Sequence, residues 1–238
     1  MRMNKSTNYT NSNHAGKQEM ILIRHGQSTA NASGVWQGHL NFPLSSEGRR
    51  QATTAGRALK GTRVSSVYAS PLSRAFETAE IVAREAGFSG EVVPVPGLTE
   101  RHGGILQGHT WAEQEALNPE FTERFLALPE DERWVLAGAE TDEEILARFE
   151  QALSDIRSLH SAADGATIII SHGGVMRAFL RDHFGPSVLP GPKRAPNASI
   201  TRLLYDSEDP NSTPQLLELA STGHLSQEEE RQAQTRVE

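Results

Sequence analysis

Residues 20–26, with the sequence MILIRHG, are the most informative segment for the fold. The apolar run from Met20 to Ile23 is typical of a strand buried on both faces of a parallel sheet. Arg24 and His25 follow directly, so they lie where that strand ends. In an α/β sheet, ligands bind at the carboxyl ends of the strands. An imidazole held there beside a guanidinium suits phosphoryl chemistry.

Strand-like runs alternate with helical patterns along the rest of the chain. The runs cover residues 19–23, 64–69, 91–95, 167–171, 199–205 and 215–220. One helix begins near residue 45, a second would be capped by Ser70 with Pro71 in its first turn, and a third has a capping box from Thr141 and Glu144. This alternation predicts an α/β fold, namely a three-layer α/β/α sandwich with a largely parallel central sheet.

The length of 238 residues suits one domain with an embellishment. We expect a flexible leader over residues 1–19, a domain over 20–224 and a polar tail over 225–238. Within the domain, residues 110–140 read as short helices broken at Pro119 and Pro129, which predicts a helical cap insertion. The Pro- and Gly-rich residues 184–196 predict a surface loop.

Composition and charge narrow the classes of function. The net charge of −7 argues against nucleic acid and against an anionic membrane as partners. The absence of cysteine excludes thiolate catalysis and fits a reducing compartment. We find no transmembrane run and no signal peptide, so we expect a cytoplasmic protein. Between Glu113 and Glu150 the chain has twelve Asp or Glu and three Arg, so the predicted cap is strongly acidic.

Chemistry-bearing residues follow three of the predicted strands. Arg24 and His25 follow the first, Arg74 lies one turn into the helix after Ser70, and His172 follows residues 167–171. A parallel sheet brings such ends together. Two arginines can bind phosphate oxygens, and the helix N-termini after Pro71 and at the glycine pair after His172 offer backbone donors to the same anion. These residues predict a phosphate pocket.

A nucleophile and an acid are the remaining requirements. His25 is the candidate nucleophile, because nearby cations keep its imidazole neutral. Glu100, in the turn after residues 94–97, is the candidate proton donor and later the base that activates water, with a bound phosphate dianion raising its pKa. Alternatives stay open at this point. The histidines could be structural core residues, Arg74 could be solvated, and a carboxylate at 143, at 144 or in the cap could replace Glu100.

Several short blocks then stand in a fixed order. They are Arg24-His25-Gly26-Gln27-Ser28 with Asn31, Gln37-Gly38-His39, Pro43-Leu44-Ser45, Gly48, Gln51-Ala52, Ser70-Pro71-Leu72-Ser73-Arg74-Ala75, Thr78-Ala79, Glu100 and Ser171-His172-Gly173-Gly174. In this order, from about Met20 to Tyr205, the blocks resemble the histidine phosphatase superfamily, which includes the phosphoglycerate mutases. One departure is Asn41, where an aspartate is common, and it does not touch the core chemistry.

The resemblance implies roles that agree with the chemical argument. It implies that His25 is the residue phosphorylated, that Arg24, Arg74 and His172 bind the transferring phosphoryl group, and that Glu100 is the proton donor. The candidate substrate-binding residues are Asn31, Gln37, Gly38, Arg101 and Gly173. Neither a cofactor nor a metal ion is expected.

Phosphatase and mutase are the two main alternatives. Residues 99–108 are similar to a block of the cofactor-dependent phosphoglycerate mutases. Those enzymes carry a tyrosine where this chain has Gly103, an asparagine where it has Gly174, and several basic residues in the cap. The acidic cap would repel a second anionic group unless Arg101 or the Lys193–Arg194 pair compensates. The sequence therefore favours a phosphatase acting on a small phosphomonoester, with a 2,3-bisphosphoglycerate-dependent mutase as the alternative.

Two further classes are weaker. His25, Glu100, His102 and His172 could ligate zinc in a metallohydrolase, but two neighbouring arginines would repel the cation. A module that binds a phosphorylated ligand without catalysis is also conceivable, although no member of the catalytic set is missing. We expect a small phosphorylated metabolite as partner. The oligomeric state stays open, with a homodimer as one possibility.

Overall fold

A computed structural model describes residues 16–190, 194–209, 212–227 and 229. Its centre is a sheet of six strands in the order β3-β2-β4-β1-β5-β6. The strands are β1 (Lys17–Arg24), β2 (Val64–Ala69), β3 (Val92–Pro94), β4 (Ala166–Ser171), β5 (Ile200–Asp206) and β6 (Gln215–Ser221). The pairs β1–β4, β4–β2 and β2–β3 are parallel, whereas β5 and β6 form antiparallel pairs at one edge.

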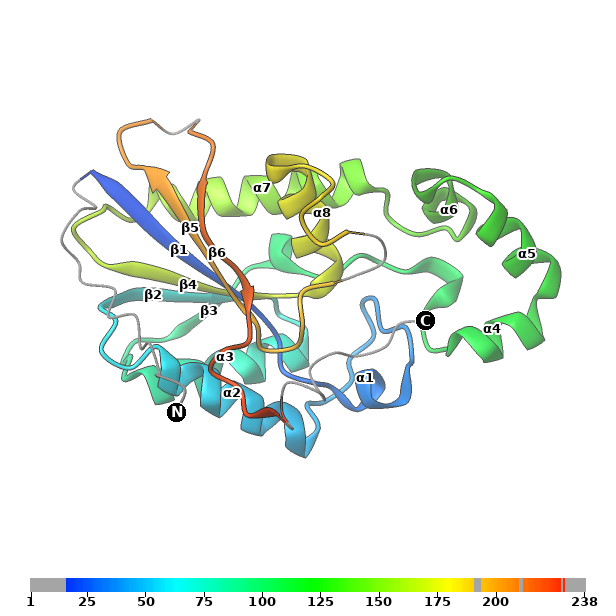
Figure 1. The fold of residues 1–238 in the computed structure, drawn as a ribbon, viewed down its shortest axis with the longest axis horizontal. Helices are drawn as coiled ribbons and strands as arrows, with labels where there is room; N and C mark the ends of the chain where they lie inside the picture. The colour runs from blue at the N-terminus through cyan, green and yellow to red at the C-terminus, as the bar shows by residue number, and fades with distance from the viewer. Residues whose placement is uncertain (1–15, 191–193, 210–211, 228, 230–238) are drawn as a thin grey trace, which may run out of the picture.

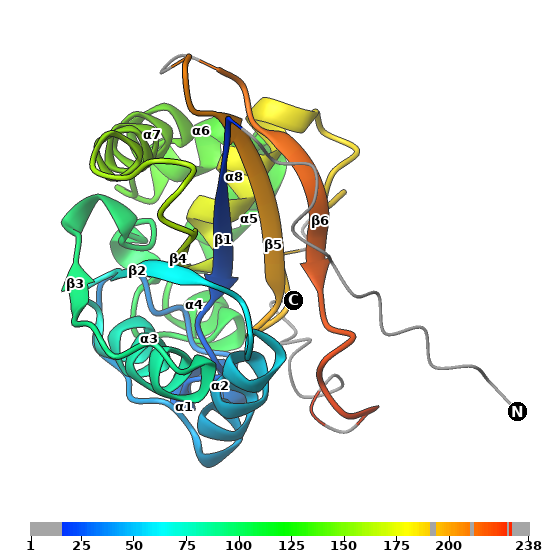
Figure 2. The same cartoon turned by 90° about the vertical axis from the view of Figure 1, so that its left-hand side faces the viewer.

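The first strand shows why the core has two halves. Ile21 and Ile23 belong to one buried cluster, and Met20 and Leu22 belong to another, because successive side chains of a strand point to opposite faces. Helices α2 (Ser46–Ala58) and α3 (Ser73–Ala86) cover the first face, and α7 (Asp142–Ser158) and α8 (Gly173–Phe184) cover the second (Figures 1 and 2). The predicted α/β/α sandwich with a largely parallel sheet is confirmed.

Short helices complete the fold. They are α1 (Thr29–Ser33), the 3-10 turns η1 (Pro96–Leu98) and η2 (Gly104–Leu106), α4 (Trp111–Leu117), α5 (Pro119–Ala127) and α6 (Glu130–Leu136). Pro119 occupies the first turn of α5 and Pro129 the N-cap of α6, so both prolines begin helices. Helices α4, α5 and α6 project beyond one end of the sheet in Figure 1, and we call them the cap. Their core consists of Leu106, Phe125, Trp134 and Ala137.

Two expectations about boundaries were wrong. Ser70 does not cap α3, which begins three residues later with Leu72 at its N-cap. The Ser70 hydroxyl accepts a hydrogen bond from the Leu72 N–H and also contacts a histidine of the site described below. Residues 17–19, assigned to the leader, form the start of β1, where Lys17 pairs with Asp206. The rest of the expected leader, residues 1–15, lies outside the described residues.

The last described residues pack against α2. Leu225 is buried, and Oε1 of Glu229 accepts a hydrogen bond of 3.1 Å from the Thr54 hydroxyl. Residues 230–238 of the expected tail lie outside the described part of the chain. None of the helices in the described ranges combines the length and the apolar character that a membrane crossing needs.

Candidate active site

Two histidines meet at the ends of adjacent parallel strands. Arg24 of β1 is in register with Ser171 of β4. The residues that follow these two strands, His25 and His172, therefore lie side by side. Their ring centroids are 5.0 Å apart, and both side chains are buried. The sheet register therefore produces the pair that the sequence placed at separate strand ends.

The hydrogen bond of His25 selects its tautomer. Nδ1 lies 2.7 Å from the carbonyl oxygen of Gly26. A carbonyl can only accept, so Nδ1 carries the proton, and Nε2 keeps a lone pair in the neutral ring. A side chain at Gly26 would collide with the backbone of Gly48, which explains the glycine after the histidine. The backbone around Gly26 therefore fixes which nitrogen of His25 is unprotonated.

Burial keeps both imidazoles neutral. It lowers the pKa of His25 well below 6.5, and the adjacent His172, Arg74 and Arg24 lower it further. Burial, followed by the charges of the same two arginines, also lowers the pKa of His172. Both rings are therefore free bases at neutral pH, the form in which an imidazole can act as a nucleophile.

Two buried arginines flank this pair. Arg24 donates through Nη1 to the carbonyl of Ala195 at 2.7 Å, and Arg74 donates to the carbonyls of Leu40 and Gly38 at 2.9 and 2.8 Å. Burial, together with Arg194 and Arg74, lowers the pKa of Arg24 to about 9, and burial lowers that of Arg74 to about 10.

Arg24 and Arg74 each have a hydrogen-bond donor that remains unused in the described part of the chain. Nε of Arg24 and Nε of Arg74 are buried and have no hydrogen-bond partner among the described residues. Both side chains line a small cavity of about 50 Å³, which we call the phosphate pocket. The two guanidinium groups repel each other, and each has an unused donor. A bound oxyanion would relieve the repulsion and accept hydrogen bonds from these donors.

Glu100 occupies the N-terminus of α8. Its two carboxylate oxygens accept hydrogen bonds from the backbone N–H groups of Gly174 at 2.9 Å, Val175 at 3.0 Å and Arg101 at 2.9 Å. Burial alone would raise the pKa of Glu100, but Arg194, these hydrogen bonds and Arg74 outweigh burial and lower it to about 2. The expectation that α8 offers its first N–H groups to a substrate anion was therefore wrong for Gly174 and Val175, because Glu100 accepts from both.

Eight of the ten candidate residues named from the sequence line the phosphate pocket. They are Arg24, His25, Asn31, Gln37, Gly38, Arg74, Glu100 and Arg101. His172 and Gly173 are not among the described residues that line it. His172 is fully buried, and its Nε2 lies 2.7 Å from the Ser70 hydroxyl. Gly173 packs closely against Arg24, because a Cβ at this position would lie only 3.1 Å from Nε of that arginine.

The polar candidates around the pocket are held by one another. Asn31 closes a capping box with Ser28 at the start of α1, and the Ser28 hydroxyl donates to Oε1 of Gln37 at 2.7 Å. Arg101 is held by the side chain of Asp142 and stacks over the Trp134 ring at 4.4 Å. These contacts leave the pocket preorganised, because its walls are already ordered by internal hydrogen bonds.

Sequence reasoning missed the importance of Arg194 and Ser70. Arg194 was considered only as a counter-charge in the Pro-rich loop. In the structure it lines the phosphate pocket, and its guanidinium lies 5.0 Å from the Trp36 ring centroid. It has no hydrogen bond or ion pair to any described residue. No local sequence pattern predicts such a position for an arginine in a loop. The contact of Ser70 with His172 was missed because a serine before a proline is also a helix-cap signal.

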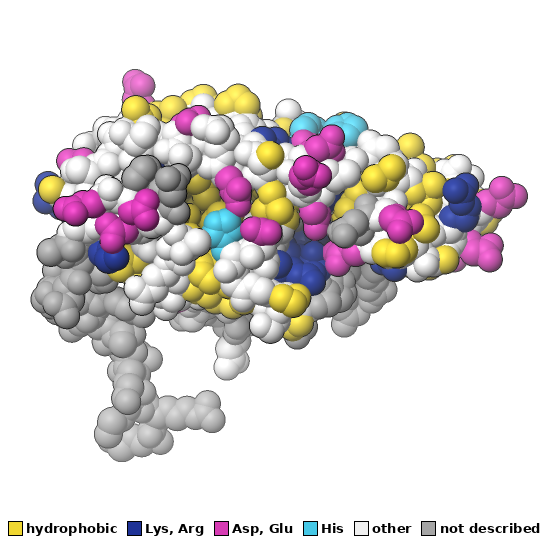
Figure 3. Space-filling view, turned by 90° about the horizontal axis from the view of Figure 1, so that it is seen from above, with side chains coloured by type: hydrophobic (Ala, Val, Ile, Leu, Met, Phe, Trp, Pro, Cys, Tyr) yellow, Lys and Arg dark blue, Asp and Glu magenta, His cyan; other side chains and the backbone are white. Residues whose placement is uncertain are grey.

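A second, larger cavity of about 290 Å³ adjoins the phosphate pocket. Four arginines line it, namely Arg101, Arg133, Arg177 and Arg194, and Glu130 is the one acidic residue among the described residues of its wall. Figure 3 shows Lys and Arg side chains in a hollow between the main body and the cap, with Asp and Glu side chains around it. The acidity of the cap is therefore peripheral, and the charge argument against a second anionic group does not hold at the cavity itself.

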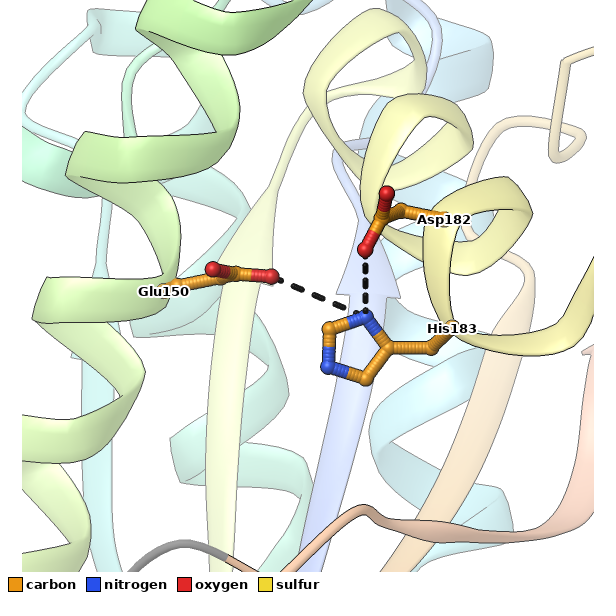
Figure 4. A group of neighbouring side chains, drawn as sticks. All are labelled: Glu150, Asp182 and His183. Carbon is orange, nitrogen blue, oxygen red and sulfur yellow. Dashed lines mark ion pairs between the residues drawn. The ribbon is translucent and has the colours of Figure 1, made fainter.

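The residues considered for zinc do not form a metal site. In the described part of the chain, Glu150, Asp182 and His183 are the group whose ligand atoms lie close enough to share an ion. They project from α7 and α8, with Nδ1 of His183 3.6 Å from Glu150 and 3.5 Å from Asp182 (Figure 4). None of them lines the phosphate pocket.

Comparisons with known proteins agree with this arrangement. The chain is 38% identical over 165 residues to a metal-independent phosphoserine phosphatase of Arabidopsis thaliana, covering 68% of each chain. It is 30% identical to a 2,3-bisphosphoglycerate-dependent phosphoglycerate mutase of Staphylococcus haemolyticus, covering 68% of this chain and 83% of that protein. A mycobacterial glucosyl-3-phosphoglycerate phosphatase solved with VO3 superposes with a TM-score of 0.72 at 25% identity, over 86% of this chain and all of the other.

A family model decides the wider relationship. The model of the histidine phosphatase superfamily (branch 1) matches residues 20–214, which is most of the chain and contains every site residue described above. The resemblance inferred from the order of the motifs is confirmed. The chain belongs to the histidine phosphatase superfamily, branch 1.

Proposed function

We propose that this chain is a phosphatase that hydrolyses a small phosphomonoester through a phosphohistidine formed at Nε2 of His25. The observation that carries the proposal is the tautomer of His25: Nδ1 donates to Gly26, so Nε2 is the nucleophilic atom in a ring whose pKa is depressed. Arg24 and Arg74 line the same pocket and supply the charges that a transferring phosphoryl group needs.

The first half-reaction transfers the phosphoryl group to the enzyme. Nε2 attacks phosphorus, the N–P bond forms, and the bond from phosphorus to the alcohol oxygen breaks. Glu100 gives the departing oxygen its proton. Since the neighbouring arginines and backbone N–H groups lower the pKa of Glu100 to about 2, this step needs the dianionic phosphate beside it to raise that pKa.

The second half-reaction restores the enzyme. Glu100, ionised again, takes a proton from water, the water oxygen attacks phosphorus, and the N–P bond breaks. Inorganic phosphate leaves, and Nε2 regains its lone pair. The site holds the two titratable groups that the cycle requires. Both pKa values are lowered, which gives a neutral base at His25 and an ionised carboxylate at Glu100.

The names of the relatives support hydrolysis of a phosphorylated metabolite. Two of the proteins compared above are phosphatases, of phosphoserine and of glucosyl-3-phosphoglycerate. Both names indicate small phosphorylated substrates, so we propose a substrate of that size. A cytoplasmic location fits a chain that has no cysteine.

A mutase is the second candidate, and one observation favours it. The four arginines of the adjoining cavity could hold the second anionic group of a bisphosphorylated cofactor. One relative, 30% identical, is a mutase. Hydrolysis remains our proposal, because Gly103 and Gly174 replace the tyrosine and the asparagine that the mutases carry.

A substrate panel distinguishes the two reactions. It contains phosphoserine, glycerol phosphate and 3-phosphoglycerate, the last with and without 2,3-bisphosphoglycerate, and follows both phosphate release and isomerisation. We expect release to dominate. Isomerisation faster than release would establish a mutase, and retained ester binding without turnover would establish a binding module. Loss of activity in a chelator would point to a metal-dependent hydrolase.

Trapping the intermediate tests the nucleophile. After rapid quenching under alkaline conditions, which preserve phosphohistidine, mass spectrometry should find one added phosphoryl group on the peptide that contains His25. His25→Ala should lose both this mass and the turnover while its circular dichroism is unchanged. Near-normal turnover in His25→Ala would overturn the mechanism.

A further inference from the structure

The larger cavity beside the phosphate pocket has aromatic walls. It is lined by Trp36, Trp111, Phe125 and Trp134, and we call it the aromatic cavity. The chain has three tryptophans in all, so every one of them lines this cavity. Indole rings are rare and energetically important residues, and their concentration beside a reaction centre calls for a physical reason.

These rings form one connected wall. The ring centroids of Trp36 and Trp134 are 6.1 Å apart, those of Phe125 and Trp134 are 6.0 Å apart, and those of Trp111 and Phe125 are 5.5 Å apart. Trp36 follows α1 beside the phosphate pocket, whereas the other rings belong to the three cap helices. The wall therefore runs from the reaction centre into the cap.

Packing of the cap alone does not require this arrangement. Phe125 and Trp134 are buried and form the cap core, but Trp36 and Trp111 are only half-buried and keep part of their surface open to the cavity. Phe121 offers a comparison within the cap. The centroids of its ring and the Phe125 ring are 5.5 Å apart, and it lines a different cavity, not the aromatic cavity.

Three guanidinium groups extend the flat surfaces. Arg101 lies over Trp134 at 4.4 Å, Arg194 over Trp36 at 5.0 Å, and Arg133 over Phe125 at 5.8 Å. A guanidinium stacked on a ring is planar and delocalised, so it presents further area for stacking. The cavity is therefore walled by planar groups, which a flat ligand contacts over more area than a branched or globular one.

Size and position allow one molecule to occupy both cavities. An apolar cavity of roughly 150 Å³ holds one benzene ring, so the 290 Å³ of the aromatic cavity has room for a fused pair of rings. The two cavities share Trp36, Arg101, Gly174 and Arg194 in their walls. An alcohol whose phosphate sits beside His25 would reach into the aromatic cavity with its carbon skeleton.

We propose that the aromatic cavity is the leaving-group subsite and that it selects phosphomonoesters whose alcohol carries a flat aromatic ring system. This inference rests on the proposed function for the orientation of the ester. Stacking on the ring wall supplies the selectivity, and the shared arginines keep the phosphate end in the first pocket.

Binding, rather than turnover, is the decisive measurement, because aryl phosphates also react faster through their better leaving groups. Phosphonates avoid that difficulty, since their P–C bond is not hydrolysed. Calorimetry with the wild-type protein should find that 2-naphthylmethylphosphonate binds about ten- to a hundredfold more tightly than methylphosphonate. Equal affinity of the two compounds would overturn the proposal.

A matched pair of variants locates the effect. Trp111→Leu removes a ring from the wall of the cavity, and Phe121→Leu removes a ring from the same cap outside the wall. The preference for the naphthyl compound should fall about tenfold in Trp111→Leu and persist in Phe121→Leu. Equal losses in the two variants would show that the cap fold, not the wall, matters, and would overturn the subsite.

The wild-type measurement stands even where a variant does not fold. Its outcomes also separate this inference from the proposed function. Tight naphthylmethylphosphonate binding by a protein without phosphatase activity would leave the subsite and refute the reaction. Rapid hydrolysis of many esters, with no difference between the two phosphonates, would leave the reaction and refute the subsite.

Discussion

Glu100 is the residue whose chemistry depends most on its surroundings. Its carboxylate caps the N-terminus of α8 by accepting hydrogen bonds from the N–H groups of Gly174 and Val175, and its pKa is lowered to about 2. An ionised carboxylate in this position is ready to accept a proton from water. In the proposed mechanism it becomes a donor only when a phosphate dianion raises its pKa. The same carboxylate would then serve both half-reactions, with the substrate setting its protonation.

Replacing this carboxylate tests the donor role. Glu100→Gln should lower kcat/KM for alkyl phosphates by about 100- to 1000-fold, because the alkoxide leaves without a proton. For p-nitrophenyl phosphate the loss should be small, since nitrophenolate needs no proton. Initial-rate kinetics measure both values, and kcat/KM reports only the steps up to alcohol release. Equal losses on the two esters would contradict the assignment.

Arg194 is the second residue for which the structure changes the interpretation. It lines both cavities without a hydrogen bond or ion pair to any described residue. Arg194→Met should lower kcat/KM about 10- to 100-fold, because one charge-assisted contact to an anion is lost. Arg181→Met is the control, since Arg181 pairs with Glu130 and lines neither cavity. Unchanged kinetics in Arg194→Met would remove this guanidinium from substrate binding.

At the scale of elements, α7 holds the loop that carries Glu100. Arg148 of α7 donates to the backbone carbonyls of Gly97, Thr99 and Glu100 at 3.1, 2.8 and 2.9 Å and pairs with Glu140. The helix is fastened at its start by the predicted Thr141 and Glu144 capping box, which is confirmed. A surface helix on one face of the sheet therefore positions a carboxylate at the sheet's end.

Removing this support should alter activity through Glu100. Arg148→Met removes a donor from three carbonyls, and only that of Glu100 keeps a further contact with a described residue, Nε2 of His39 at 2.7 Å. We expect a loss of about 1–3 kcal/mol in the free energy of unfolding. The kcat for alkyl phosphates should also fall, more than the kcat for p-nitrophenyl phosphate, and Arg148→Lys should restore part of it. Urea unfolding and kinetics measure the two effects. A stability loss with equal kinetics on both esters would show that Arg148 is only structural.

At the scale of the whole molecule, the paired histidines link stability to pH. Folding lowers the pKa of His25 and of His172 below the unfolded value of 6.5. As the pH falls below 6.5, the unfolded chain binds protons that the folded chain does not bind, so the free energy of unfolding falls. Each histidine contributes a slope of about 1.4 kcal/mol per pH unit until its folded pKa is reached.

Urea unfolding as a function of pH measures this linkage. The free energy of unfolding of the wild-type protein should decrease steadily from about pH 6.5 to about pH 5.5, whereas His25→Asn should show a slope smaller by about 1.4 kcal/mol per pH unit. Above the unfolded pKa the two slopes should coincide. Identical slopes below pH 6.5 would show that His25 is protonated in the folded protein.

Hydrophobic periodicity and local signals are the features that a sequence displays directly. The unbroken apolar run from Met20 to Ile23 needs burial on both faces, which a strand provides when helices cover both sides of its sheet, so the sandwich followed from the sequence. Arg24, His25 and Arg74 were found because each stands at a strand or helix end whose position that pattern sets. The cap helices followed from Pro119 and Pro129, because proline starts or interrupts helices wherever it stands.

The fold class, the cap and the strand-end residues could be predicted from the sequence, because these depend on neighbours in the chain. The tautomer of His25, the ionised state of Glu100, the position of Arg194 and the side of the cap on which its charges lie could be read from the folded chain alone. These properties arise from contacts between segments far apart in sequence, and burial makes each such contact electrostatically strong. A net count made the cap acidic, whereas packing turned Arg133 and three other arginines toward the cavity.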